Sequence, residues 1–320
     1  MKFRLGYVAM TLGLEDCSPS GAVTYKTFEK LSGGEARLYR LRKVANKNLQ
    51  NTLRILRYNK AMNISVYRLT SKLIPLATHP ELLQWNYIND FAEGLREIGD
   101  FIKQNNFRIS AHPDHFTIIN SPLPKVFEDS LRDLDYHVKL FESMGLEDSK
   151  YKLVLHVGGV YGNKQDSIER FCANFTKLPG RIRDRLIIEN DDKSYNTYEV
   201  LALCKRLGAP MVLDVHHHNC LCEKEDLGKV LPEIFDTWKG EYFHPKIHFS
   251  SPRGIKDFRS HADLIDFNEF ADFLTIASSV GRDFDVMLEA KSKDVALLSL
   301  SDELAAAGFK QKNNSEFEME

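Results

Sequence analysis

The feature that most constrains the fold of this chain is an alternation of short apolar runs with longer amphipathic stretches, repeated eight times. The runs are rich in β-branched residues and predict buried strands at residues 5–9, 64–69, 107–111, 153–157, 186–189, 211–215, 246–249 and 284–289. The stretches between them space their apolar residues three to four apart, which is typical of helices. Eight strands that are each followed by a helix predict a parallel sheet closed into a single-domain (β/α)8 TIM barrel.

The expected helices follow from the same periodicity. The first three are marked by Leu49 with Leu53 and Leu56, by apolar residues across 88–102, and by apolar residues across 126–141. Later helices are expected at residues 165–178, 197–207, 225–235, 267–280 and 292–306. The barrel is expected to cover residues 1–307. The remaining residues, 308–320, read as a polar C-terminal tail that is frayed.

Composition and cysteine usage bound the class of protein. Hydrophobic residues make up 43% of the chain and charged residues 28%, as in soluble globular proteins with a sizeable core. No apolar run approaches the ~18–20 residues needed to cross a bilayer, and the first residues read as a strand rather than a signal peptide. The five cysteines are odd in number and dispersed, so we expect no disulfide framework, a cytoplasmic location and no membrane partner.

The charge distribution is more informative than the net charge of −2. Residues 36–80 contain no Asp or Glu but ten basic residues: Arg37, Arg40, Arg42, Lys43, Lys47, Arg54, Arg57, Lys60, Arg68 and Lys72. Two interpretations stay open. The segment could lie against the phosphates of a nucleic acid, or it could be a solvated helix face paired with acids elsewhere in the fold.

Candidate functional residues gather where the expected strands end. The active site of a (β/α)8 barrel forms at the C-terminal ends of its strands. The third to eighth strands each deliver a histidine, carboxylate or lysine there: His112 and His115, His156, Glu189, Asp214 and His217, Lys246 and His248, and Glu289, with His261 in the loop after the seventh. Crowded carboxylates need accompanying cations, and mixed imidazole and carboxylate ligands favour Zn²⁺, Mn²⁺ or Fe²⁺ over Mg²⁺ or Ca²⁺. This many ligands indicates two or three metal ions.

The run His216-His217-His218 needs a choice between neighbours. A loop position three residues after Asp214 can return to the mouth, which favours His217 as the ligand. An alternative is a separate zinc site that includes Cys220 and Cys222, although their spacing does not match a zinc knuckle.

Several motifs in order resemble those of the UV damage endonucleases, relatives of the endonuclease IV barrel. They are RLGYVAMTLGL, YRLTSKLIPLATHP, SAHPDHF, LHVGGVYGNK, IIENDD, LDVHHHN, KIHFSSPRG with RSHADLI, and MLEAKSKD, and together they cover nearly the whole chain.

The resemblance implies a site of three metal ions, most often Mn²⁺, with Zn²⁺ as the other candidate. His112 and His156 would bind one ion, and Glu189 would bridge it to a second. The second ion's shell would be completed by Asp214, His248 and Glu289, and a third ion would be held by His217 and His261. Lys246 matches a lysine that is carboxylated in some members of the family. Glu189, Lys246 and Tyr7 are then the expected catalytic residues.

The resemblance has two departures. Arg259 stands two residues before His261, where the endonuclease IV pattern has an Asp, which implies a differently completed third metal shell. His115-Phe116 stands where many members carry Gln-Tyr, so Phe116 is expected to keep the role of a wedge in the DNA. Phe116 could instead be ordinary packing. The expected DNA contacts are Tyr7, His115, Phe116, Lys164 and Arg68.

The expected function is hydrolysis of damaged duplex DNA immediately 5′ of a UV photoproduct or another distorting lesion, which leaves a 3′-hydroxyl and a 5′-phosphate. Closely spaced metals can activate water and stabilise the departing oxygen. Selectivity would come from the lower cost of kinking and unstacking damaged DNA. We expect a monomer. The rival interpretations are an abasic-site endonuclease, a metal-dependent sugar isomerase and a catalytically silent barrel that only binds a partner.

Overall fold

The computed structural model describes residues 1–221 and 226–319, and it contains a closed barrel of eight parallel strands. The strands follow one another around the barrel in chain order, and β1 closes it by pairing with both β8 and β2. They are β1 Lys2–Val8, β2 Val66–Leu69, β3 Arg108–Ala111, β4 Lys152–His156, β5 Leu186–Glu189, β6 Met211–Asp214, β7 Lys246–Phe249 and β8 Phe284–Leu288. The prediction of a single-domain (β/α)8 barrel is confirmed.

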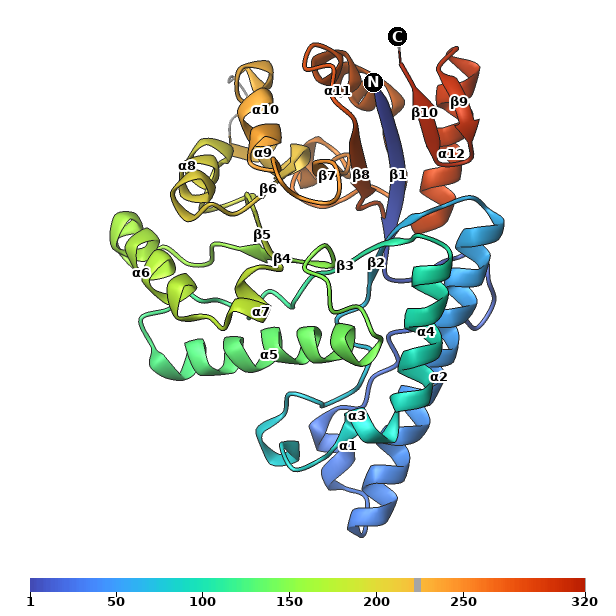
Figure 1. Cartoon of the computed structure of the whole chain (residues 1–320), viewed down its shortest axis with the longest axis vertical. Helices are drawn as coiled ribbons and strands as arrows, with labels where there is room; N and C mark the ends of the chain where they lie inside the picture. Colours follow the sequence, from blue (N-terminus) through green and yellow to red (C-terminus); the bar gives the residue numbers. More distant parts are fainter. Residues whose placement is uncertain (222–225, 320) are drawn as a thin grey trace.

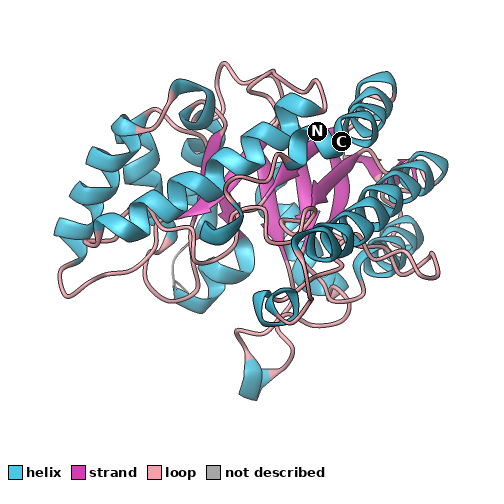
Figure 2. Ribbon diagram, turned by 90° about the horizontal axis from the view of Figure 1, so that it is seen from below, coloured by secondary structure: helices cyan, strands magenta, loops and turns pink. Residues whose placement is uncertain are grey.

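Helices surround the strands, as Figures 1 and 2 show. The longer ones are α2 Gly34–Ala61, α4 Ala92–Gln104, α5 Pro124–Ser143, α6 Lys164–Lys177, α8 Thr197–Leu207, α10 Leu227–Asp236, α11 Phe267–Ser278 and α12 Lys293–Ala306. Short helices that periodicity did not predict are α1 Tyr25–Glu29, α3 Tyr87–Asp90, α7 Gly180–Arg183, α9 Val215–Leu221 and the 3-10 turns Pro80–Leu82 and Ile255–Asp257. The start expected at residue 225 for α10 falls outside the described residues.

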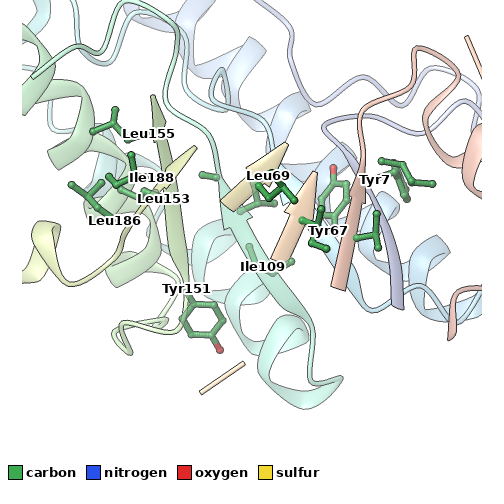
Figure 3. Packing of buried hydrophobic residues seen from close by; sticks show 14 of the residues in the cluster. Tyr7, Tyr67, Leu69, Ile109, Tyr151, Leu153, Leu155, Leu186 and Ile188 are labelled. Carbon is green, nitrogen blue, oxygen red and sulfur yellow. The ribbon is translucent and has the colours of Figure 1, made fainter. Parts of the chain in front are cut away.

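Alternation along each strand separates an inner from an outer set of side chains. On β1, β2 and β8, one set of side chains includes Val8, Val66 and Met287, which pack together as a small apolar cluster. The other set includes Tyr7 and Tyr67 and belongs to the main hydrophobic core (Figure 3). Gly6 lies where β1 meets β2, and a Cβ there would come within 2.3 Å of the Val66 carbonyl oxygen. A side chain at this position would therefore force the two strands apart.

The C-terminal residues are not frayed, which corrects the prediction for the tail. They form a hairpin of β9 Lys310–Asn313 and β10 Glu316–Glu318, and β10 pairs antiparallel with residues 2–4 of β1. β2 pairs with β1 only from Gly6 onward, so the first residues of β1 present an edge that β10 covers. Phe317 is fully buried there and stacks on Phe3 at 5.3 Å between ring centroids. The Phe317 ring ties this mostly polar segment to the core, and Phe309 and Met319 also pack against that core.

The segment after β6 is also different from the prediction. The sequence predicted a loop that returns His217 to the mouth, whereas the structure has the helix α9. The Asp214 carboxylate accepts a hydrogen bond of 2.8 Å from the backbone N–H of His217, as a capping residue does at a helix start. Residues three apart lie on one face of a helix, so His217 is still carried to the same side as Asp214.

Within the described part of the chain, we find no helix with the length and apolar character required to cross a membrane.

Candidate metal centre at the barrel mouth

Glu189 is the central residue of the site. It is the last residue of β5 and is almost fully buried, and three imidazoles face its two oxygens. Its Oε2 lies 3.1 Å from His112 Nε2 and 3.5 Å from His156 Nε2. Its Oε1 lies 2.7 Å from His248 Nδ1. These ligand-type atoms come from strands β4, β5 and β7 and from the residue after β3, so four different strands position them.

Glu189 belongs to two groups of residues that could each hold a cation. One is His112 with His156 and Glu189, and the other is Glu189 with Asp214, His248 and Glu289. Within each group, one ligand atom from every residue lies within 4.8 Å of all the others. This is the arrangement that the resemblance implied for two ions bridged by Glu189.

Two buried atoms of the second group test whether a metal fits. Asp214 Oδ2 and His248 Nε2 have no hydrogen-bond partner among the described residues, although both are shielded from solvent. An unpaired buried carboxylate oxygen costs roughly 1–3 kcal/mol or more, so such atoms need a reason to exist. A bound divalent cation supplies one for the carboxylate, and the mixed nitrogen and oxygen donors suit Mn²⁺ or Zn²⁺. The residues therefore fit the metals that the family implies.

The electrostatics keep the two glutamates ionised. Burial acts to raise the pKa of Glu189, but His248 and His156 outweigh it and hold that pKa well below its usual range. Burial is likewise outweighed at Glu289, where Arg68 and His248 keep the pKa well below the ordinary value. Arg68 forms an ion pair with Glu289 at the mouth. Negative charge is thus available to a cation at neutral pH.

Asn190 positions Asp214 and His217, a role that the sequence analysis did not predict. Its amide group bonds the backbone of Asp214 twice, donating to the carbonyl at 2.9 Å and accepting from the N–H at 2.8 Å. Its own carbonyl oxygen lies 3.0 Å from His217 Nδ1. A side chain that pairs with the backbone of a neighbouring strand leaves no periodic signal in the sequence. The only hint was its place directly after Glu189.

The two histidines expected to hold a third ion lie at the mouth but in neither group of possible ligands. His217 Nδ1 contacts the Asn190 carbonyl, and His261 Nδ1 lies 2.7 Å from the carbonyl oxygen of Glu289. These contacts orient each ring so that Nε2 is the nitrogen left for a ligand. The ring centroids are 6.4 Å apart. Burial tends to lower the pKa of His217, but Asp214 and Glu189 raise it to about 9.

Lys246 lies inside the barrel, two residues before His248 on β7. It is buried, and its Nζ donates to Ser110 Oγ at 2.8 Å. Burial, together with the positive charges of Arg108 and Arg68, holds the pKa of Lys246 well below its ordinary value. A buried amine of lowered pKa has the chemistry that carboxylation requires, because the neutral amine is the form that reacts.

Tyr7 does not reach the mouth, and its predicted contacts with DNA and with the reacting phosphate are wrong in this structure. The residue is fully buried, and its hydroxyl donates to Asn59 Oδ1 on α2 at 2.5 Å. Its ring meets that of Tyr67 edge-on at 5.4 Å, within the core between strands and helices (Figure 3). β1 is apolar at successive positions, so the sequence did not reveal which of its faces turns inward.

The remaining expected DNA contacts are differently placed. His115 and Phe116 are exposed beyond β3, and the Phe116 side chain is 52% accessible, so it is not core packing. Lys164 begins α6 and pairs with Glu199 at 2.8 Å.

The alternative zinc site would use Cys220 and Cys222. The Sγ atom of Cys220 lies 3.9 Å from Nε2 of His216, and Cys222 is outside the described residues.

The fold and the mouth define a class of protein: a TIM barrel with two clusters of histidine and carboxylate ligands that share Glu189. The family model described as UV-endonuclease UvdE matches residues 3–319, and the chain belongs to this family. The protein named UV DNA damage endonuclease from Bacillus cereus (strain B4264) is 46% identical over 307 residues, covering 96% of each chain. A protein of the same name from Bacillus thuringiensis subsp. konkukian (strain 97-27) is 44% identical over 317 residues, covering 98% of this chain and 99% of the other.

One solved structure agrees with this assignment, and another shares the fold. The crystal structure of SacUVDE superposes with a TM-score of 0.84 at 33% identity, covering 95% of this chain and 99% of that one. Endonuclease IV from Thermus thermophilus reaches a TM-score of 0.51 at 15% identity, covering 89% of this chain and 91% of that one. This second likeness shows a shared fold alone. The comparisons therefore do not favour the abasic-site alternative.

Proposed function

We propose that this protein is a metal-dependent DNA repair endonuclease that nicks duplex DNA immediately 5′ of UV photoproducts and other distorting lesions. The product ends are a 3′-hydroxyl and a 5′-phosphate. The observation that carries the proposal is the convergence of five potential ligands around Glu189. Three of them, His156, Asp214 and His248, have a buried atom with no hydrogen-bond partner among the described residues. Membership of the UvdE family and the names of its relatives supply the substrate class.

The proposal assigns the ligands as follows. His112 and His156 hold one cation, Glu189 is shared, and Asp214, His248 and Glu289 hold the second. His217 and His261 hold the third, each oriented through its Nδ1. Bound divalent cations, most often Mn²⁺, supply an activated water and positive charge at the phosphate.

The chain's own groups bind and orient the substrate around these ligands. The Arg68 guanidinium, beside Glu289, provides a positive group at the rim for a phosphate. Lys246 is held by Ser110 inside the barrel and, once carboxylated, would present an acid beneath the site. Density from crystals grown with bicarbonate would reveal that modification.

Lesion recognition in this proposal depends on the loop after β3. Phe116 is half exposed and lies beside His115, with 5.9 Å between the ring centroids. An apolar ring of this kind can enter a base step whose stacking is already weakened. The Phe116→Ala variant should therefore lose discrimination between damaged and intact duplexes.

A nicking assay tests the function directly. Duplexes that are UV-irradiated, abasic or undamaged are incubated with the protein in Mn²⁺ or in EDTA, and the ends are mapped on a sequencing gel. We expect cuts 5′ of the photoproduct in Mn²⁺ only. The Glu189→Gln variant removes the charge shared by both groups and should lower kcat by about 10³-fold or more, within the several kcal/mol that metal catalysis contributes. Activity that persists in EDTA, or that Glu189→Gln retains, would overturn the proposal.

A further inference from the structure

Three basic residues in the first half of the first long helix lack the hydrogen bonds and ion pairs that most other cations of that helix form; Lys60, near the far end of the helix, also lacks them, but its Nζ lies 5.9 Å from the centre of the Phe101 ring. Arg40, Lys43 and Lys47 are exposed on α2, and none has a hydrogen bond or ion pair with any residue in the described ranges 1–221 and 226–319. They are spaced three and four residues apart, so they lie along one face. We call these three residues the α2 stripe.

The neighbouring cations of α2 show that the stripe is a separate feature. Arg42 pairs with Asp90 at 2.7 Å, and Arg57 pairs with Glu97 at 3.1 Å. Arg54 donates to backbone carbonyls in the loop after β1. The interpretation of this acid-free segment as a paired helix face therefore holds for Arg42 and Arg57 but fails for the stripe.

The stripe lies on the mouth side of the barrel. α2 follows the C-terminal end of β1, and Figure 1 shows its N-terminal half reaching past the barrel with α1 and α3 beside it. A groove of about 350 Å³ runs between the stripe and the loop that contains Gly21 and Ala22. The same two loop residues also line a second cavity, which reaches Phe116. The surface is thus continuous from the exposed wedge to the stripe.

Buried hydrogen bonds hold this surface in one arrangement. Asn48, which follows Lys47, is buried, and its side chain bonds both the N–H and the carbonyl of Gly21 at 2.8 and 2.9 Å. It also donates to the carbonyl of Leu73 at 3.0 Å, and Asn51 donates to that of Ser18 at 2.8 Å. The loop cannot move far from the helix without breaking them.

We propose that the α2 stripe binds the phosphate backbone of the duplex that flanks the lesion, beyond the segment held at the metals. This inference rests on the proposed function. The helix from Arg40 to Lys47 spans about 10 Å, which matches about three phosphate steps of one strand along the duplex axis. Unpaired, exposed cations bind phosphates by releasing condensed counterions, without reading sequence. Asp16 is the one carboxylate among the residues that line the groove, against the three cations of the stripe.

The test is the salt dependence of DNA binding. The triple variant Arg40→Gln, Lys43→Gln, Lys47→Gln is compared with wild type on a long duplex carrying one central photoproduct, with EDTA present to prevent cleavage. Each lost phosphate contact should lower the slope of log Kd against log salt by about 0.9, so the triple variant should lose about 2.7. The ratio of the triple variant's Kd to the wild-type Kd should then fall about 40-fold between 50 and 200 mM salt.

A matched control separates the stripe from charge in general. The variant Arg57→Gln, Lys60→Gln, Lys103→Gln removes the same number of charges near the C-terminal ends of α2 and α4, at the opposite end of the barrel, and should keep the wild-type slope. The double variant Lys43→Arg, Lys47→Arg should also keep it. On a short duplex that ends close to the lesion, the stripe variant should nick with wild-type kcat.

The outcomes distinguish this inference from the function beneath it. If wild type fails to nick irradiated DNA, the proposed function is wrong and the stripe loses its partner. If wild type nicks but the folded triple variant keeps the wild-type slope, only the stripe proposal is overturned. If the stripe instead joins two copies of the chain, the molecular mass of wild type will depend on protein concentration and that of the triple variant will not. The slope of log Kd against log salt will then be the same for both proteins, which also contradicts the proposal.

Discussion

At the residue scale, the site depends on side chains whose partners are set by backbone geometry. Asn190 links the ends of β5 and β6, because its amide pairs with the backbone of Asp214. Its carbonyl oxygen also contacts the His217 ring. Groups that orient metal ligands fix the ligand geometry, and their removal weakens metal binding.

The Asn190→Ala variant should therefore need more metal. Without the amide, Asp214 and His217 lose their fixed orientation, and the Mn²⁺ concentration for half-maximal nicking should rise about 10–100-fold. Asn174→Ala is the control, because Asn174 makes a similar buried bond to the Ile119 carbonyl but lies away from the ligands. An unchanged metal requirement in Asn190→Ala would show that Asn190 does not position the ligands.

A second residue-scale prediction concerns Asp133 on α5, which accepts a hydrogen bond from Thr117. Burial raises its pKa to about 6, above the ordinary value of 3.8. Between pH 3.8 and about pH 6, folding therefore takes up a proton at Asp133. Above that range, the buried and charged carboxylate lowers the free energy of unfolding. Asp133→Asn should stabilise the protein by about 1–3 kcal/mol at pH 7.5 and by much less at pH 4.

Urea unfolding of Asp133→Asn and wild type at the two pH values checks this sign. The exposed residue Asp302 is a control, since Asp302→Asn should change stability little at either pH. Equal stability differences at pH 4 and 7.5 would contradict the burial argument.

At the element scale, the C-terminal hairpin covers an edge of the barrel sheet. β10 pairs with the first residues of β1, and the Phe317 ring completes an aromatic stack with Phe3, whose ring lies 5.8 Å from that of Phe284. An uncovered strand edge is prone to pair with other chains, so the hairpin protects the molecule as well as adding to its core.

The Phe317→Ala variant should lose about 3–5 kcal/mol of unfolding free energy, because a large buried ring leaves a cavity between β1 and its neighbours. Chemical denaturation measures the loss. The control variant is Phe258→Ala, because Phe258 is partly exposed in the loop after β7. A loss below about 1 kcal/mol in Phe317→Ala would mean that the hairpin is only loosely attached.

At the scale of the whole molecule, the barrel converts residues from distant segments into one anionic site. Glu189 and Glu289 are 100 positions apart in the chain, yet both lie near His248. Ionised, buried carboxylates repel one another, so the folded state should be more stable with cations than without.

Mn²⁺ should therefore raise the thermal midpoint of the wild-type protein relative to EDTA. A cation at about 100 times its Kd adds about 2.7 kcal/mol for each site that the unfolded chain does not bind. Glu189→Gln should lose most of this gain, while the α2 stripe variant should keep it. Calorimetry with no difference between Mn²⁺ and EDTA would rule out a metal centre at the mouth.

The sequence by itself determined the barrel and the residues at its mouth. Eight apolar runs separated by helical periods have essentially one compact solution, and parallel strands bring their C-terminal ends together, so His112, Glu189, Asp214, His248 and Glu289 had to meet. Only the tertiary structure decided the orientation of Tyr7, the role of Asn190, the pairing of the tail with β1 and the separation of the α2 stripe from its paired neighbours. A strand buried on both faces does not show which face turns inward, and the partner of a polar side chain lies on another element of the fold.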